Sequence, residues 1–87
     1  MADPTIVTLT RDTWVKVASS VTSATIDIRK SEPLPVYQTY RMAGGSAPTD
    51  MTDATICDYP QQLVQTGAAI DVYMYAQGWA TTAKVSL

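Results

Sequence analysis

The sequence predicts an all-β fold, a small antiparallel β-sandwich or flattened barrel of about seven to eight short strands. Thr, Val and Ile recur throughout, whereas Glu occurs once, at Glu32, and β-branched residues suit extended backbone better than helix. Several segments alternate apolar and polar residues with period two, and no long segment carries an apolar stripe at helical spacing. A chain of 87 residues has room for one small domain. We expect this domain to span 1–87, with residues 1–4 as a candidate flexible arm.

The N-terminal half contains four segments with strand character. The predicted strands are 5–10, 13–18, 22–29 and 34–42, separated by polar turns at 11–12 and 19–20 and by a loop at 30–33. Alternation is clearest in the third, where Ala24, Ile26 and Ile28 share the face expected to point inward. Pro35 cannot donate to a sheet ladder, so we expect it at the start of its strand or on an edge.

The C-terminal half opens with the strongest loop signal, residues 43–50, which are rich in Gly, Ser and Pro. Residues 51–59 fit either a short strand around 54–57 or a helical turn capped by Asp50 or Thr52. The remaining predicted strands are 62–66, 69–76 and 79–87, with turns at Gly67 and at Gln77-Gly78. We expect the last two strands to form a hairpin. The first and last strands carry few charges, so we expect them to pair with each other or to be covered by a neighbour.

The charge pattern argues against a nucleic-acid or membrane protein. The net charge is -2, and six Lys and Arg are scattered along the chain rather than clustered on one face. No apolar stretch approaches the roughly 18 residues of a membrane-spanning helix. The first residues lack the basic and apolar regions of a signal peptide, so we expect synthesis in a cytoplasm.

The residues of common catalytic and metal sites are scarce. The chain has no His and one Cys, which leaves no Ser-His-Asp or Cys-His group, no His-ligated zinc and no disulfide within the chain. We expect Cys57 to be a buried, reduced thiol. The carboxylates at 50, 53 and 58 do not match a calcium loop, and Gly44-Gly45 does not match a phosphate loop. The sequence therefore predicts no enzyme, no cofactor and no metal site.

The aromatic residues are the most informative set. Phe is absent, and Tyr and Trp are the aromatic residues enriched at protein interfaces because they carry a polar group. The residues predicted to form a partner interface are Trp14, Tyr37, Tyr40, Tyr73, Tyr75 and Trp79. The alternative is that some of them cover barrel ends or loops. A carbohydrate platform is a third possibility, disfavoured because the chain has no Asn.

Five runs of the sequence form a recognisable order: 13–18 (TWVKVA), 25–28 (TIDI), 45–48 (GSAP), 67–80 (GAAIDVYMYAQGWA) and 83–86 (AKVS). In this order they resemble the small all-β accessory proteins of tailed-bacteriophage virions. Residues 73–75 (Tyr-Met-Tyr) depart from the family, which more often has a Trp-Ala-Arg-like segment there. These are β-hairpin elements rather than a catalytic signature, and no catalytic residue is carried over.

The resemblance implies a structural role in the virion, after synthesis in the host cytoplasm. The expected function is capsid decoration or cement, with the major capsid protein or another virion protein as partner. A head-fibre or tail subunit is also within the family. The expected assembly is a homo-oligomer, with a trimer as the first choice. The alternative function is a carbohydrate- or host-surface-binding module of a tail or fibre.

Overall fold

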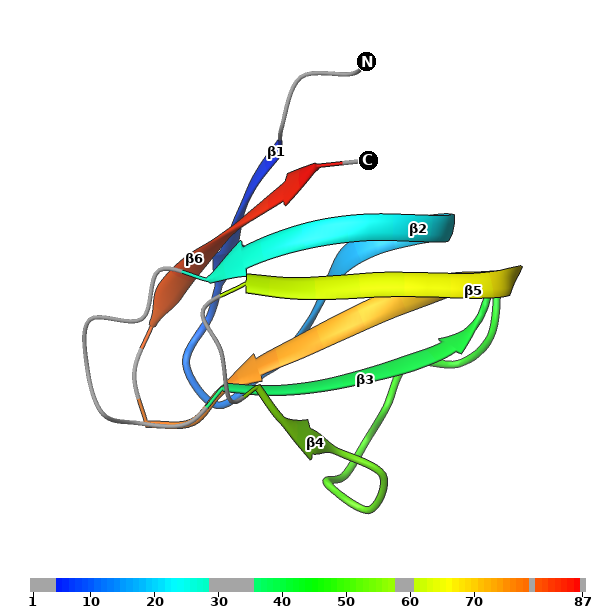
Figure 1. The fold of residues 1–87 in the computed structure, drawn as a ribbon. Helices are drawn as coiled ribbons and strands as arrows, with labels where there is room; N and C mark the ends of the chain where they lie inside the picture. The colour runs from blue at the N-terminus through cyan, green and yellow to red at the C-terminus, as the bar shows by residue number, and fades with distance from the viewer. Residues whose placement is uncertain (1–4, 29–35, 58–60, 79, 87) are drawn as a thin grey trace.

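The described residues form one antiparallel sheet of six strands in the order β1-β6-β2-β5-β3-β4 (Figure 1). The structure is a computed structural model that describes residues 5–28, 36–57, 61–78 and 80–86, with 61–66 described at the backbone. The strands are β1 Thr5–Leu9, β2 Trp14–Ile28, β3 Val36–Met42, β4 Thr55–Ile56, β5 Gln61–Ala76 and β6 Thr81–Ser86. The expected all-β fold is therefore confirmed.

Two long strands bend the sheet so that its halves face each other (Figure 1). The first half of β2 pairs with the end of β5, while the second half of β2 pairs with the start of β5 and with β6. The register of β2 against β5 shifts between Lys16 and Ala18, between Ala18 and Val21, and between Val21 and Ser23. Such bulges bend and twist a strand without ending it. Ser20 lies in the same stretch with a φ of 53°, a left-handed conformation that is uncommon outside glycine.

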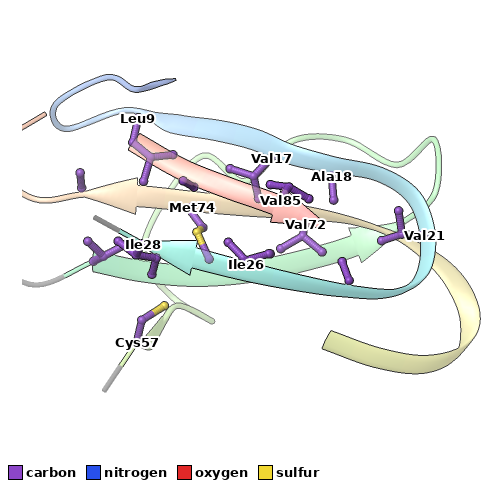
Figure 2. Close-up of a cluster of buried hydrophobic side chains, with 14 of the residues drawn as sticks. Leu9, Val17, Ala18, Val21, Ile26, Ile28, Cys57, Val72, Met74 and Val85 are labelled. Atoms are coloured by element: carbon purple, nitrogen blue, oxygen red, sulfur yellow. The ribbon is translucent and has the colours of Figure 1, made fainter. Parts of the chain in front are cut away.

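The core fills the space between the two halves (Figure 2). Ile26 from the second half of β2, Val72 and Met74 from β5 are all fully buried. Val17 and Val21 reach the same cluster from the first half of β2, and Cys57 is buried beside β3 as expected. Both halves of one strand thus contribute to one core, which requires the bend.

Within the part of the chain that the structure describes, the strands are fewer and longer than predicted. The segments predicted at 13–18 and 22–29 are one continuous strand, β2, and those at 62–66 and 69–76 are one strand, β5. The small residues at 19–20 and at Gly67, which predict turns, lie instead where a strand bends. The pairing between β2 and β5 continues before and after each of these positions. Of the segment predicted at 51–59, residues 51–57 are described and contain the short strand β4 rather than a helical turn, while 58 and 59 lie outside the described residues.

The predicted C-terminal hairpin is wrong. Strand β5 already has β2 on one side and β3 on the other, so β6 pairs with β1 and with the second half of β2. The connection after β5 turns at Gly78, whose φ is 79° and whose N–H donates to Asp12 Oδ1 at 2.8 Å. The expectation that the terminal strands pair with each other is confirmed, since Thr5 lies opposite Val85.

Candidate functional site

Aromatic side chains form a row across three strands on the face of the sheet opposite the core. Trp14 in β2 lies opposite Tyr75 in β5, and Tyr75 lies opposite Tyr37 in β3. The ring centroids of Trp14 and Tyr75 are 5.3 Å apart with planes at 56°, and those of Tyr37 and Tyr75 are 6.4 Å apart with planes at 68°. Both pairs have the tilted or edge-to-face geometry that aromatic rings prefer. We call Trp14, Tyr75 and Tyr37 the aromatic row.

The aromatic row continues to an exposed apolar residue. Ile56 in β4 lies opposite Tyr37 and is 50% exposed. The three rings themselves are half-buried. Residues directly opposite each other on antiparallel strands point to the same face, so the four side chains share one surface.

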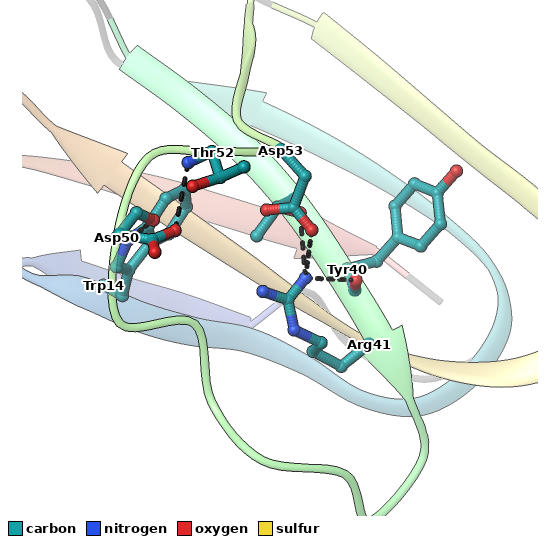
Figure 3. A network of polar contacts seen from close by, with 7 residues as sticks. Trp14, Tyr40, Arg41, Asp50, Thr52 and Asp53 are labelled. Atoms are coloured by element: carbon teal, nitrogen blue, oxygen red, sulfur yellow. Dashed lines mark hydrogen bonds and ion pairs between the residues drawn. The ribbon is translucent and has the colours of Figure 1, made fainter.

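A long loop between β3 and β4, residues 43–54, crosses the same side of the sheet (Figure 3). We call it the strap. The indole Nε1–H of Trp14 donates to the carbonyl oxygen of Asp50 at 3.1 Å, and Arg41 Nη1 binds Asp53 Oδ2 at 2.7 Å. Pro48, in the middle of the strap, is buried. The strap is therefore fixed to the sheet at several points, one of them a ring of the aromatic row.

The buried carboxylate of Asp71 ties the strap to the bend in β2. Its Oδ1 accepts the Ser20 N–H at 2.9 Å, and its Oδ2 accepts the Gly44 N–H at 3.2 Å and lies 3.5 Å from Lys16 Nζ. The Ser20 N–H is the main reason why the pKa of Asp71 lies below its usual value, and Gly44 and Lys16 act in the same direction against desolvation. Both backbone donors belong to residues with positive φ, so Asp71 stabilises two unusual backbone conformations at once.

The two acidic residues of the strap, Asp50 and Asp53, bind groups of this chain, one within the loop and one in β3. The N–H of Thr52 donates to Asp50 Oδ1 at 3.0 Å, and hydrogen bonds from Thr52 lower the pKa of Asp50. Asp53 pairs with Arg41. Asp58 lies outside the described residues. No group of three or more His, Cys, Asp or Glu side chains within the described residues could hold a metal ion.

The sequence-predicted interface residues separate into distinct places. Trp14, Tyr37 and Tyr75 come together in the aromatic row. Tyr73 is only 5% exposed, between Lys16 and Thr39 of the neighbouring strands, so it adds little surface. Tyr40 is 58% exposed on the other face of β3, where it lies opposite Val72. Trp79 lies outside the described residues.

Sequence reasoning missed two components of the site. Ile56 was hidden in a segment that fitted strand or helical turn equally well, and no sequence signal marks it as the end of the row. The strap was recognised as a loop, but composition alone does not indicate where a loop docks. Pro48 at its centre was the only signal that it has a fixed shape.

A small pocket lies beside β3, next to the strap residue Asp53. Its volume is about 330 Å³, and it is lined by Gln38, Thr39, Tyr40, Asp53 and Thr55. The lining offers an amide, a carboxylate, hydroxyl groups and one exposed phenol. These are groups that hydrogen-bond and stack on small polar ligands.

The described residues contain no helix with the length and apolar character to cross a membrane. Comparison of the chain with protein-family models, with curated proteins and with solved structures finds no match.

Proposed function

We propose that this protein is a structural component of a bacteriophage virion, a capsid decoration or cement protein that bridges neighbouring capsid subunits. The observation that supports this most is the aromatic row, which places three Trp and Tyr rings, each only partly buried, on the face of the sheet opposite the core. Trp and Tyr are the residues that most often dominate the binding energy of protein interfaces. The partner under this proposal is the major capsid protein or another virion protein.

The geometry of the aromatic row suits adhesion because its rings are already ordered. Each ring contacts a neighbour across the strands, and the Trp14 indole is also held by the Asp50 carbonyl. Ordering a mobile side chain on binding costs about 0.5–1.5 kcal/mol, and a preorganised ring avoids part of that cost. Many copies on one capsid would then add their weak contacts through avidity.

The test uses two tyrosines of the same strand that point to opposite faces. Capsids that lack the protein are mixed with wild type, Tyr37→Ala or Tyr40→Ala, and co-sedimentation is measured across a concentration series. Wild type and Tyr40→Ala should bind to saturation, whereas Tyr37→Ala should bind more weakly with an unchanged circular dichroism spectrum. Equal binding by all three proteins, or no binding by wild type, would contradict the proposal.

A second candidate function, carbohydrate or host-surface binding, is favoured by one observation. The pocket beside β3 brings together Gln38, Asp53 and the exposed ring of Tyr40. A planar amide and a carboxylate can bind neighbouring hydroxyl groups of a sugar, and an aromatic ring can pack against its apolar face. The same two variants separate the candidates. In a glycan array, loss of binding in Tyr40→Ala but not in Tyr37→Ala would support the pocket and not the aromatic row.

A further inference from the structure

Strand β1 is an edge strand without the features that normally protect an edge. It pairs with β6 on one side and stands last in the strand order, with no strand on its other side among the described residues. Its five residues, Thr-Ile-Val-Thr-Leu, include no charge, no proline and no bulge. Ile6 is 63% exposed on the outer face, and Val7 is only half-buried on the inner face. Natural sheets usually block such an edge because it can pair with another strand.

Two other described edges, at β4 with β3 and at the first half of β2, are protected. Strand β4 has only two residues, and beyond it the edge of β3 lies beside the Arg41–Asp53 ion pair of the strap. The first half of β2 carries Lys16 and three register shifts, which twist it away from regular pairing. The start of β5, residues 61–65, pairs with β2 and also has no described strand on its other side. Of these two open edges, β1 is the one whose described side chains include exposed or half-buried apolar groups, Ile6 and Val7.

We propose that β1 pairs antiparallel with β1 of a second copy of this chain, around a two-fold axis at Val7. A two-fold axis perpendicular to the sheet keeps the outer faces of both copies on the same side, so only residues with the same inward or outward orientation can lie opposite each other. The register centred on Val7 is the one that pairs all five residues of both strands. It places Val7 opposite its counterpart and Ile6 opposite Thr8 of the second copy.

A second copy suits this edge because both faces of the new pair gain apolar contact. On the inner face the two half-buried Val7 side chains meet, and on the outer face each exposed Ile6 packs on the methyl group of a Thr8. No like charges oppose each other within the paired segment. A five-residue pair buries far less than the roughly 1,600 Å² of a standard interface, so the contact is weak in dilute solution. It becomes effective where many copies are held close together.

This inference goes beyond the proposed function, because it concerns the opposite half of the sheet from the aromatic row and does not depend on which partner the row binds. It assigns a two-fold contact, whereas the resemblance to phage proteins suggested a trimer.

The test is register-specific disulfide trapping with Ile6→Cys and Thr8→Cys. Directly opposite residues have Cα atoms about 4.5–5.5 Å apart, within the range of about 4.4–6.8 Å for a disulfide, whereas diagonal neighbours at about 7–8 Å lie outside it. An oxidised mixture of the two variants should therefore give covalent dimer, and each variant alone should give little. The native thiol of Cys57 is buried and should not compete.

Sedimentation velocity provides a second readout that needs no oxidation. Wild type should show a concentration-dependent shift toward dimer, which Ile6→Lys should abolish with an unchanged melting temperature. Met42→Lys is the matched control, since Met42 is 65% exposed on the distant strand β3, and it should dimerise like wild type. Equal crosslinking in all three oxidised samples would overturn the proposal, as would a monomer at every concentration or dimers that Ile6→Lys does not affect. Tyr37→Ala should leave the crosslinking unchanged, so failure here is distinguishable from failure of capsid binding.

Discussion

The aromatic row should behave as an energetically coupled unit. The perturbation is a double-mutant cycle of Trp14→Ala and Tyr75→Ala, the two rings whose centroids are 5.3 Å apart. If the rings stabilise each other, the double variant will be less destabilised than the sum of the two single variants. The difference is the coupling free energy between the two rings.

The geometry sets the expected magnitudes. An aromatic pair contributes about 0.5–1.5 kcal/mol beyond its buried area, and Tyr75 makes two such pairs, with Trp14 and Tyr37. Half-burial of its ring adds about 1 kcal/mol, roughly half the value for a fully buried large side chain. Tyr75→Ala should therefore lower the free energy of unfolding by about 2–4 kcal/mol, and the Trp14–Tyr75 coupling should be about 0.5–1.5 kcal/mol.

Urea unfolding followed by far-ultraviolet circular dichroism measures all four proteins, because tryptophan fluorescence is altered by the substitution itself. The matched control is the cycle of Trp14→Ala with Tyr40→Ala, since Tyr40 lies on the other face of β3. Its coupling should fall within the roughly 0.3–0.5 kcal/mol scatter of independent sites. A Trp14–Tyr75 coupling no larger than this control would refute the reasoning.

Three further predictions test the structure around the site. The folded-state pKa of Asp71 is lowered mainly by the Ser20 N–H. The carboxylate of Asp71 therefore stabilises the fold fully above the ordinary carboxyl pKa, and this stabilisation is lost as the pH falls through the lowered pKa. Asp71→Asn should flatten the plot of unfolding free energy against pH below about pH 4. Gly44→Ala should destabilise by about 1 kcal/mol because φ is 82° there, whereas Gly67→Ala, with equally open space and no positive φ, should be neutral or stabilise by about 0.4–1 kcal/mol in urea unfolding. Ile26→Ala should cost about 2–5 kcal/mol by the same assay, because Ile26 is fully buried in the core.

The sequence predicted the fold class but not the connectivity. Alternation correctly placed Ala24, Ile26 and Ile28 in the core, because a period of two is a local property of a strand. It could not show that Ser20 and Gly67 lie within long strands, since a turn and a bulge favour the same small residues. The neighbours of each strand depend on contacts between distant segments, which explains why the expected C-terminal hairpin was wrong.

The candidate site was predictable to a similar degree. Alternation placed Tyr73 and Tyr75 on one face of their strand and the buried Val72 and Met74 on the other face, as the structure confirms. It could not distinguish the two tyrosines, because the exposure of a ring depends on what lies over it. The side of the sheet that the strap crosses is decided by contacts such as Gly44 with Asp71, which join residues far apart in the chain.

The bend in β2 and β5 gives the two proposed contacts different directions. The aromatic row lies across β2, β5 and β3 in one half of the sheet, and the β1 edge belongs to the half that contains β6 and the end of β2. One molecule could then bind a capsid subunit through the row while its β1 pairs with a neighbouring copy, so each contact would raise the local concentration for the other. Under these proposals, the binding curve of Ile6→Lys on capsids should lie at higher protein concentration and rise less steeply at low occupancy than the curve of wild type. It should still reach saturation, because the aromatic row is intact. Binding identical to wild type would show that the β1 contact contributes nothing to assembly.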